Sequence, residues 1–150
     1  MHPIMDGIII YFANFTVNPR FYTAHVASLF FLENINAILE DRTESILRHA
    51  DLWDAYIKSR KGREPNIDSK IKYIQKRAEN KNDTLHKCFS DDLLDRVLAW
   101  KEERNRMIHA LLKQQLTEED VTRIASEGND LVRALRSRAS AYNKALERRK

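Results

Sequence analysis

The organisation of this chain follows most directly from one segment, Trp100-Lys-Glu-Glu-Arg-Asn-Arg-Met-Ile-His109. At about 100° per residue of an α-helix, Arg104 projects into the middle of the apolar side, whereas Asn105 and His109 lie together on its edge, one turn apart. A guanidinium among apolar neighbours needs a partner or water, because leaving it desolvated and unpaired is costly. Arg104 therefore breaks the local pattern, as residues of functional sites often do. The apolar side itself comprises Leu93, Leu94, Val97, Trp100, Ile108, Leu111 and Leu112.

The size and composition predict a single helical domain. The chain of 150 residues is long enough for one hydrophobic core, and we expect one domain over residues 1–150, with residues 1–19 unassigned. Glycine and proline occur only three times each, which favours helices. No apolar run approaches the roughly 18 residues of a membrane span, and no signal peptide is recognised. A single cysteine, Cys88, excludes an internal disulfide, so we expect a cytoplasmic protein with no membrane partner.

A long helical region is expected after Pro19, which is a natural helix start. Apolar residues recur at helical spacing from Arg20 to about Lys58. This pattern fits either one very long helix or two helices, and we favour a break near Asp41. The reason is that Asp41-Arg-Thr-Glu44 resembles a capping box.

A loop and two further helices are expected next. Glycine, proline and asparagine mark residues 60–66 as a loop, and a shorter helix comes after it, ending in a turn at residues 80–83. Ser90 is expected to cap the helix that contains Arg104, and we extend that helix to about Gln115. The inward residues of the shorter helix are expected to be Ile67, Ile71 and Ile74.

The last helix is expected to begin at Thr117-Glu-Glu-Asp120, another capping-box sequence. The fold class is therefore all-α, a helical bundle of four to five helices joined by short loops. A strand at residues 8–12 is an alternative that the sequence leaves open. The apolar stripe of the last helix comprises Val121, Ile124, Leu131, Val132, Leu135, Ala139, Tyr142 and Leu146.

Arg104-Asn105-x-x-x-His109, near the end of the penultimate helix, resembles the Arg-x(4–6)-His motif of the HEPN superfamily, in which a polar residue commonly follows the arginine. The resemblance extends to the helical layout of residues 20–146. It implies a HEPN-like helical bundle that usually dimerises. In many members of that superfamily the motif arginines and histidines of two protomers line one cleft that cuts RNA without a metal. Other members have lost catalysis and serve as binding modules.

Two other residue pairs also satisfy the Arg-x(4–6)-His spacing, Arg20-x(4)-His25 and Arg42-x(6)-His49. The first arginine is followed by an aromatic residue and lies at a helix entry. Arg42 lies among acidic residues, where a solvent-exposed salt bridge is the expected use. We therefore assign the motif to the Arg104 set and keep the pair Arg42/His49 as the alternative.

The residue types of the Arg104 set suit RNA cleavage. RNA carries its own nucleophile, the 2′-hydroxyl, whose attack on the adjacent phosphate gives a cyclic phosphate. We expect His109 to be the general acid or base, because histidine is the residue type that exchanges protons near neutral pH. Arg104 is expected to stabilise the charge of the transition state, and Asn105 to orient His109 or the phosphate. Lys101 and Arg106 would hold the RNA backbone.

The catalytic hypothesis requires a homodimer. On an ideal helix Arg104 and His109 diverge by about 140°, so one chain cannot easily aim both at one point. Two copies around a twofold axis would bring Arg104 of one chain near His109 of the other. The aromatic residues near the N-terminus are expected in core or dimer packing rather than in base stacking. They are Phe12, Phe15, Phe21, Tyr22, Phe30 and Phe31.

The net charge of +4 suits a polyanionic partner. It is concentrated in residues 123–150, which hold eight basic and three acidic residues. Arg136 and Arg138 would extend a phosphate-binding track beside the cleft. A solvated helix face with a basic tail is the plainer alternative for this region.

The sequence leaves two functions of different classes open. One is a metal-independent endoribonuclease of a prokaryotic toxin or defence system, a setting implied by the resemblance alone, with an antitoxin or other protein as a further partner. The other is a non-catalytic HEPN-like module that binds a protein or nucleic acid, in which Arg104 pairs with an acid of a neighbouring helix. A basic bundle that only coats nucleic acid is a weaker third interpretation. No cofactor is expected, and the scattered histidines predict no metal site.

Overall fold

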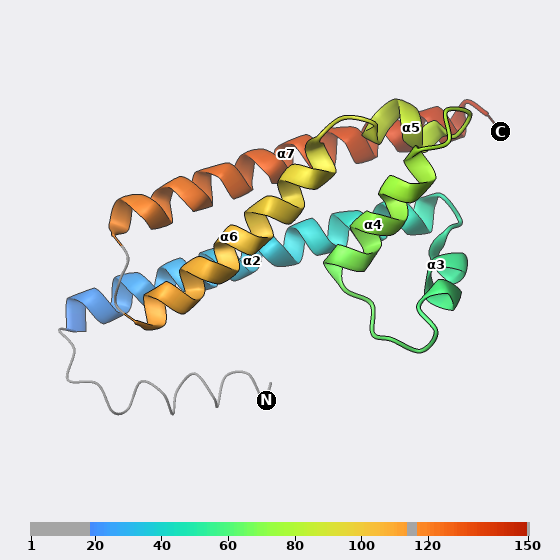
Figure 1. The fold of residues 1–150 in the computed structure, drawn as a ribbon. Helices are drawn as coiled ribbons and strands as arrows, with labels where there is room; N and C mark the ends of the chain where they lie inside the picture. The colour runs from blue at the N-terminus through green and yellow to red at the C-terminus, as the bar shows by residue number, and fades with distance from the viewer. Residues whose placement is uncertain (1–18, 114–116, 150) are drawn as a thin grey trace.

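The computed structural model describes residues 19–113 and 117–149, and helices dominate that part of the chain (Figure 1). The all-α prediction is confirmed, although the described residues form six helices instead of four to five. The segment 1–18, with the alternative strand at residues 8–12, lies outside the described residues. The helices are α2 (Pro19–His49), α3 (Trp53–Ser59), α4 (Ile67–Ala78), α5 (Thr84–Phe89), α6 (Leu93–Leu112) and α7 (Glu118–Glu147).

The three longest helices form the body of the bundle. α2 and α7 lie side by side and run in the same direction, and α6 runs back across them (Figure 1). α4 packs on α2, α5 and α6, and α5 also contacts α7. The buried apolar side chains of the described residues join in one cluster, so α6 is held by its neighbours along most of its length.

A tryptophan and a glycine set the distance between α6 and α7. The ring of Trp100 is buried, and its Nε1 donates a hydrogen bond of 2.8 Å to the carbonyl oxygen of Ile124. The ring lies over Gly128, where an added Cβ would be 2.6 Å from Cζ2 of Trp100 and 2.8 Å from Cγ2 of Ile35 on α2. Glycine in mid-helix normally lowers stability, and here it permits the close approach of three helices.

The predicted break near Asp41 is wrong, because α2 continues to His49. Thr43 does not cap a new helix. It is buried, and its Oγ1 donates to the carbonyl oxygen of Glu40 at 2.8 Å, a back-bond within the same helix. The chain turns at Asp51 instead, with a φ of 55°. Aspartate adopts this left-handed conformation more readily than most residues.

The predicted cap at Ser90 is also wrong. Ser90 ends α5, a six-residue helix that the sequence pattern did not predict. Asp83 begins α5 by accepting a hydrogen bond of 3.0 Å from the backbone N–H of Leu85. At the other end of α6, the helix stops at Leu112, short of the predicted Gln115, and residues 114–116 lie outside the described residues. The predicted start of α7 is confirmed, since Thr117 and Asp120 form a capping box.

A buried lysine ties α4 to α2. The side chain of Lys70 is only 4 % exposed, and its Nζ binds Glu40 at 3.1 Å and Glu44 at 3.0 Å. Glu44 also binds Arg48 at 2.8 Å. Burial of the Glu44 carboxyl raises its pKa, but hydrogen bonds and charge from Lys70 and Arg48 outweigh burial and lower the pKa below its ordinary value of 4.5. The ionised form of Glu44 thus stabilises the fold.

We expect Glu44→Gln to lower the free energy of unfolding at pH 7 by about 1–2 kcal/mol, because a hydrogen bond to a charged group is lost. The folded-state pKa is the lower one, so the contribution of Glu44 is present above pH 4.5 and disappears as the pH falls through the folded-state value. Denaturant unfolding of both proteins at pH 7 and pH 3 measures this. A difference of the same size at both pH values would contradict the assignment.

Candidate functional site

Arg104 lies on the buried face of α6, as the sequence pattern predicts. The residue is 7 % exposed and follows the buried Trp100 in the same stripe. The stripe continues through Met107, which is buried, whereas Ile108, expected to face inward, is only half-buried. Steps of three and four residues link Trp100, Arg104 and Met107, so the arginine takes a position that a core residue would occupy.

Two side chains bind the guanidinium. Nη2 of Arg104 forms an ion pair with Oε1 of Glu33 on α2, and Nη1 donates a hydrogen bond of 2.6 Å to Oδ1 of Asn105. Nε is buried and makes no hydrogen bond with the described residues. An acid of a neighbouring helix therefore holds Arg104, in agreement with the alternative interpretation of the sequence.

Glu33 places this ion pair at the surface of the bundle. Its side chain is 58 % exposed, whereas that of Arg104 is 9 % exposed. The guanidinium reaches from the core to a carboxylate that water also contacts. A phosphate oxygen approaching from solvent would compete with Glu33 for the same N–H groups.

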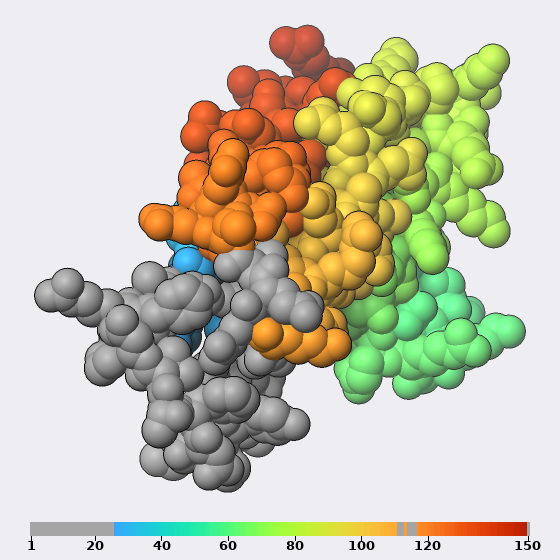
Figure 2. Space-filling view, turned by 60° about the vertical axis from the view of Figure 1, so that its left-hand side comes forward, coloured from blue at the N-terminus to red at the C-terminus, as the bar shows by residue number. Residues whose placement is uncertain are grey.

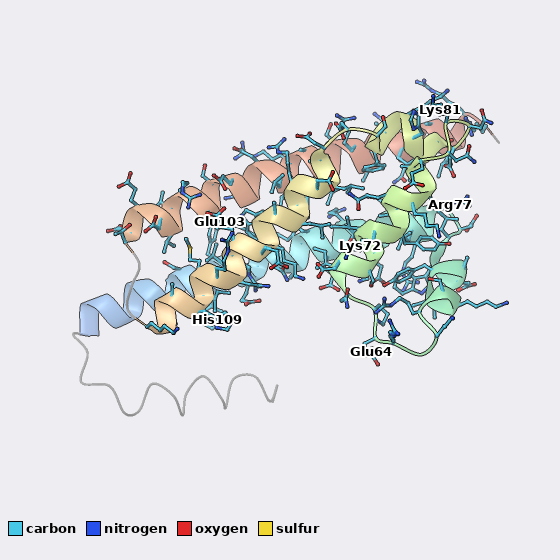
Figure 3. The ribbon with its side chains drawn as sticks, in the orientation of Figure 1. Glu64, Lys72, Arg77, Lys81, Glu103 and His109 are labelled. Carbon is cyan, nitrogen blue, oxygen red and sulfur yellow. The ribbon has the colours of Figure 1, made fainter. Side chains whose placement is uncertain are left out.

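His109 is exposed near the end of α6. It points away from α7, whereas Glu103 points toward α7 and binds Arg123 there at 2.8 Å (Figure 3). Among the described side chains, those of residues 26–110, 113 and 117–149, none forms a hydrogen bond or an ion pair with its ring. Because Arg104 faces α2 and His109 faces solvent, the structure does not bring the two side chains of one chain together.

The alternative pair, Arg42 and His49, lies elsewhere on α2. Nδ1 of His49 is 2.8 Å from the carbonyl oxygen of Ser45, which is a local contact at the end of the helix. Nε of Arg42 is 3.9 Å from Asp41, a long version of the salt bridge that the sequence predicted. Neither residue is bound by two side chains in the way that Glu33 and Asn105 bind Arg104. Variants of this pair are therefore matched controls for variants of Arg104 and His109.

The four residues expected to bind nucleic acid fall into two groups. Lys101 binds both carboxylate oxygens of Asp68 on α4 at 2.6 Å. Arg138 forms an ion pair with Asp91 and donates to the carbonyl oxygen of Cys88 at 3.1 Å. Their charges thus hold helices together. Arg106 and Arg136 are exposed, and both are free of ion pairs with the described residues.

An apolar surface lies on α2 next to Glu33. Phe30 and Phe31 are 59 % and 46 % exposed, and Ile38 is 38 % exposed. We call these three apolar residues the α2 patch. A shallow hollow of this surface is lined in part by Glu33. Phenylalanines exposed side by side are unusual on a monomer and mark contact surfaces.

A second concentration of basic residues was missed in the sequence analysis. Residues 58–81 hold nine basic and three acidic residues, a larger local excess than that of residues 123–150. These charges lie on α3, on α4 and in the loops on either side of α4. The excess of basic residues in this segment is visible in the sequence itself, although the sequence pattern predicts only a loop and a short helix there.

The described part of the chain gives no evidence for a reactive cysteine, a metal site or a membrane-spanning helix. Cys88 is buried, and burial raises the pKa of its thiol, which disfavours the reactive thiolate. The described residues contain no group of three or more histidine, cysteine, aspartate or glutamate side chains placed to hold a metal ion. None of the helices described is both long enough and apolar enough to cross a membrane.

Comparison with known proteins identifies no relative: no protein-family model, no curated protein and no solved structure matches this chain.

Proposed function

We propose that this chain is a HEPN-like, metal-independent endoribonuclease whose site is shared between the two subunits of a homodimer. The observation that carries the proposal is the state of Arg104. It is buried in a core position, yet its guanidinium binds two polar side chains, one of which is the solvent-exposed carboxylate of Glu33, and an exposed histidine follows five residues later. A purely structural bundle gains little from a cation at that position.

The chemistry assigned to the site uses three side chains. A base removes the proton of the 2′-hydroxyl, the resulting oxygen attacks phosphorus, and the 5′-oxygen leaves with a proton, giving a 2′,3′-cyclic phosphate and a 5′-hydroxyl end. His109 exchanges these protons with the solvent it faces. Arg104 stabilises the charge that builds up on the phosphate oxygens, and Asn105 fixes the guanidinium through its hydrogen bond of 2.6 Å.

A second copy of the chain completes the site. Arg104 and His109 of one chain face different directions, so a phosphate held by one needs the other from a partner subunit. The α2 patch supports this arrangement, because it adjoins Glu33 and therefore the exposed side of the Arg104 ion pair. An isologous contact through α2 places both copies of that ion pair close to the twofold axis.

The biological setting extends the proposal and rests on the resemblance to HEPN proteins alone. A nuclease of this kind acts on cytoplasmic RNA as a prokaryotic toxin or defence protein, and an antitoxin would be a natural protein partner.

The direct test is a cleavage assay on single-stranded RNA in the presence of EDTA, together with a solution mass measurement. We expect fragments with cyclic phosphate ends from a dimer of the wild-type chain. We also expect Phe31→Asp, which places a charge in the α2 patch, to give a monomer that does not cleave. Ile57→Asp is the matched control, because Ile57 is a comparably exposed apolar residue on α3. A wild-type chain that is monomeric and leaves RNA intact would refute the proposal.

The ion pair with Glu33 favours a second candidate, a non-catalytic HEPN-like binding module. In that function Arg104 joins α6 to α2, and His109 is a surface residue. RNA cleavage distinguishes the two candidates. The binding module cuts no RNA under any condition, and its His109→Ala variant binds the partner as the wild-type chain does.

A further inference from the structure

A hollow of about 610 Å³ lies between α3 and α4. Two of its lining residues, Lys72 and Arg77, lie on α4, away from His109 on α6 (Figure 3). Its volume is within the range of ligand-binding pockets. Four basic side chains line it, and no acidic side chain does. We call it the α3–α4 hollow. Its lining residues are Tyr56, Ser59, Arg60, Ser69, Lys72, Tyr73, Lys76, Arg77 and Asn80.

The acids of this segment do not neutralise the hollow. Asp68 is occupied by Lys101 of α6 at 2.6 Å, and Glu64 and Glu79 are exposed and do not line it. The four basic side chains therefore share a concave surface without a lining carboxylate. A concave surface lined by one sign of charge concentrates counter-ions of the other sign.

Three of the four cations, Arg60, Lys72 and Lys76, form no ion pair with the described residues, whereas Arg77 is paired. Lys72 and Lys76 are exposed, one turn apart on α4, and neither forms an ion pair with the described residues. Like charges at this spacing repel each other and weaken the helix. Anionic groups bound to the two ammonium groups would remove that cost.

The two arginines are already oriented by the protein. Nη2 of Arg60 donates to the carbonyl oxygen of Glu64 at 3.0 Å, while its Nε is buried and has no hydrogen-bond partner in the described chain. Arg77 is held by Asp83 at 3.1 Å. A guanidinium fixed at one edge presents its remaining N–H groups at low entropic cost, which suits the binding of phosphate.

We propose that the α3–α4 hollow binds the phosphodiester backbone of a single RNA strand. The choice of RNA rests on the function proposed above, for which the hollow would hold substrate outside the cleavage site. Lys72 and Lys76 are about 6 Å apart along the helix axis, so they meet successive phosphates of one strand rather than a single anion. Hydroxyl and amide groups of Ser59, Ser69 and Asn80 line the same hollow and can donate to phosphate or ribose oxygens.

The hollow is connected to the helix that carries the cleavage site. α4 and α6 are neighbours in the bundle, and the ion pair between Lys101 and Asp68 joins them at the first turn of α4. In the view of Figure 2, α6 lies at the surface between α7 and α4, so a strand leaving the hollow can follow the surface to α6.

The test is a binding assay with a 2′-O-methylated uridine oligonucleotide, which lacks the nucleophile and so cannot be cut. We expect Lys72→Gln/Lys76→Gln to weaken binding about tenfold or more at 0.15 M salt, and to lower the salt slope by about 1.4, for two lost contacts with a single strand. The matched control is Arg148→Gln/Arg149→Gln, which removes two exposed charges from the end of the chain and should change binding far less. Thermal unfolding should show both variants folded.

Two results would overturn this inference. The first is a hollow variant that binds the oligonucleotide with the wild-type affinity and salt slope. The second is a hollow variant that loses affinity for free uridine monophosphate but keeps its affinity for the oligonucleotide, which would make the hollow a site for a small ligand. Cleavage is measured separately on unmodified RNA. A wild-type chain that binds RNA through the hollow but does not cut it would refute the proposed nuclease activity and would still support RNA binding by the hollow.

Discussion

Trp100→Ala is expected to lower the free energy of unfolding by about 3–5 kcal/mol, the range for truncation of a large buried aromatic residue. The ring is buried among α2, α6 and α7 and donates a hydrogen bond of 2.8 Å to Ile124. Its removal leaves a cavity at the point where the three long helices meet. Chemical denaturation of the two proteins measures the loss.

Gly128→Ala tests the same packing from the opposite side. Its new methyl group would lie within 2.8 Å of Trp100 and Ile35, so we expect a loss of about 1–3 kcal/mol, although alanine is the better helix former. In the Trp100→Ala background the same change should cost less, or stabilise, because the ring atoms are gone. Ser137→Ala, at an exposed position of α7, controls for helix propensity. Strictly additive effects would contradict the close packing of Trp100 on Gly128.

His109→Ala is expected to reduce RNA cleavage by about 10²–10⁴-fold, the usual contribution of a general acid or base. Arg104→Lys should reduce the cleavage rate by about 10²–10³-fold. This is the usual loss when an enzyme lacks one preorganised hydrogen-bond donor to the charge of the transition state. Lysine keeps the charge but cannot bind Glu33, Asn105 and a phosphate oxygen with one planar group. Single-turnover cleavage at saturating protein measures the chemical step.

The alternative motif supplies controls of the same residue types. His49→Ala and Arg42→Lys should leave cleavage unchanged, because those side chains make local contacts on another part of α2. If His49→Ala abolishes cleavage while His109→Ala does not, the site has been assigned to the wrong pair. Because Arg104 is also a packing residue, Arg104→Lys should be shown to unfold at the wild-type temperature within a few degrees.

Local signals in the sequence predicted much of the helical layout. The capping box at Thr117 and Asp120 marks the start of α7, and Ile71 and Ile74 of α4 are buried as the spacing predicted. The burial of Arg104 followed from its place in the helical pattern. These features depend on residues within one or two turns of each other, so one segment is sufficient to predict them.

Features that depend on distant segments were not predictable in the same way. The identity of Glu33 as the partner of Arg104 depends on the register between α2 and α6. The capping-box pattern at Asp41 failed because packing buries Thr43 inside a continuous helix. The α3–α4 hollow forms only because the fold places Arg60, Lys72 and Lys76 around one concave surface. The sequence shows the excess of basic residues in this segment but not that surface.

Mixing two inactive variants tests most directly whether Arg104 of one subunit works with His109 of the other. Arg104→Ala and His109→Ala chains are each expected to be inactive. After subunit exchange, half of the dimers are mixed, and each mixed dimer holds one intact site out of two, so activity should return to about a quarter of the wild-type value. A mixture that stays as inactive as either parent, although mass measurement shows that mixed dimers have formed, would contradict the shared site.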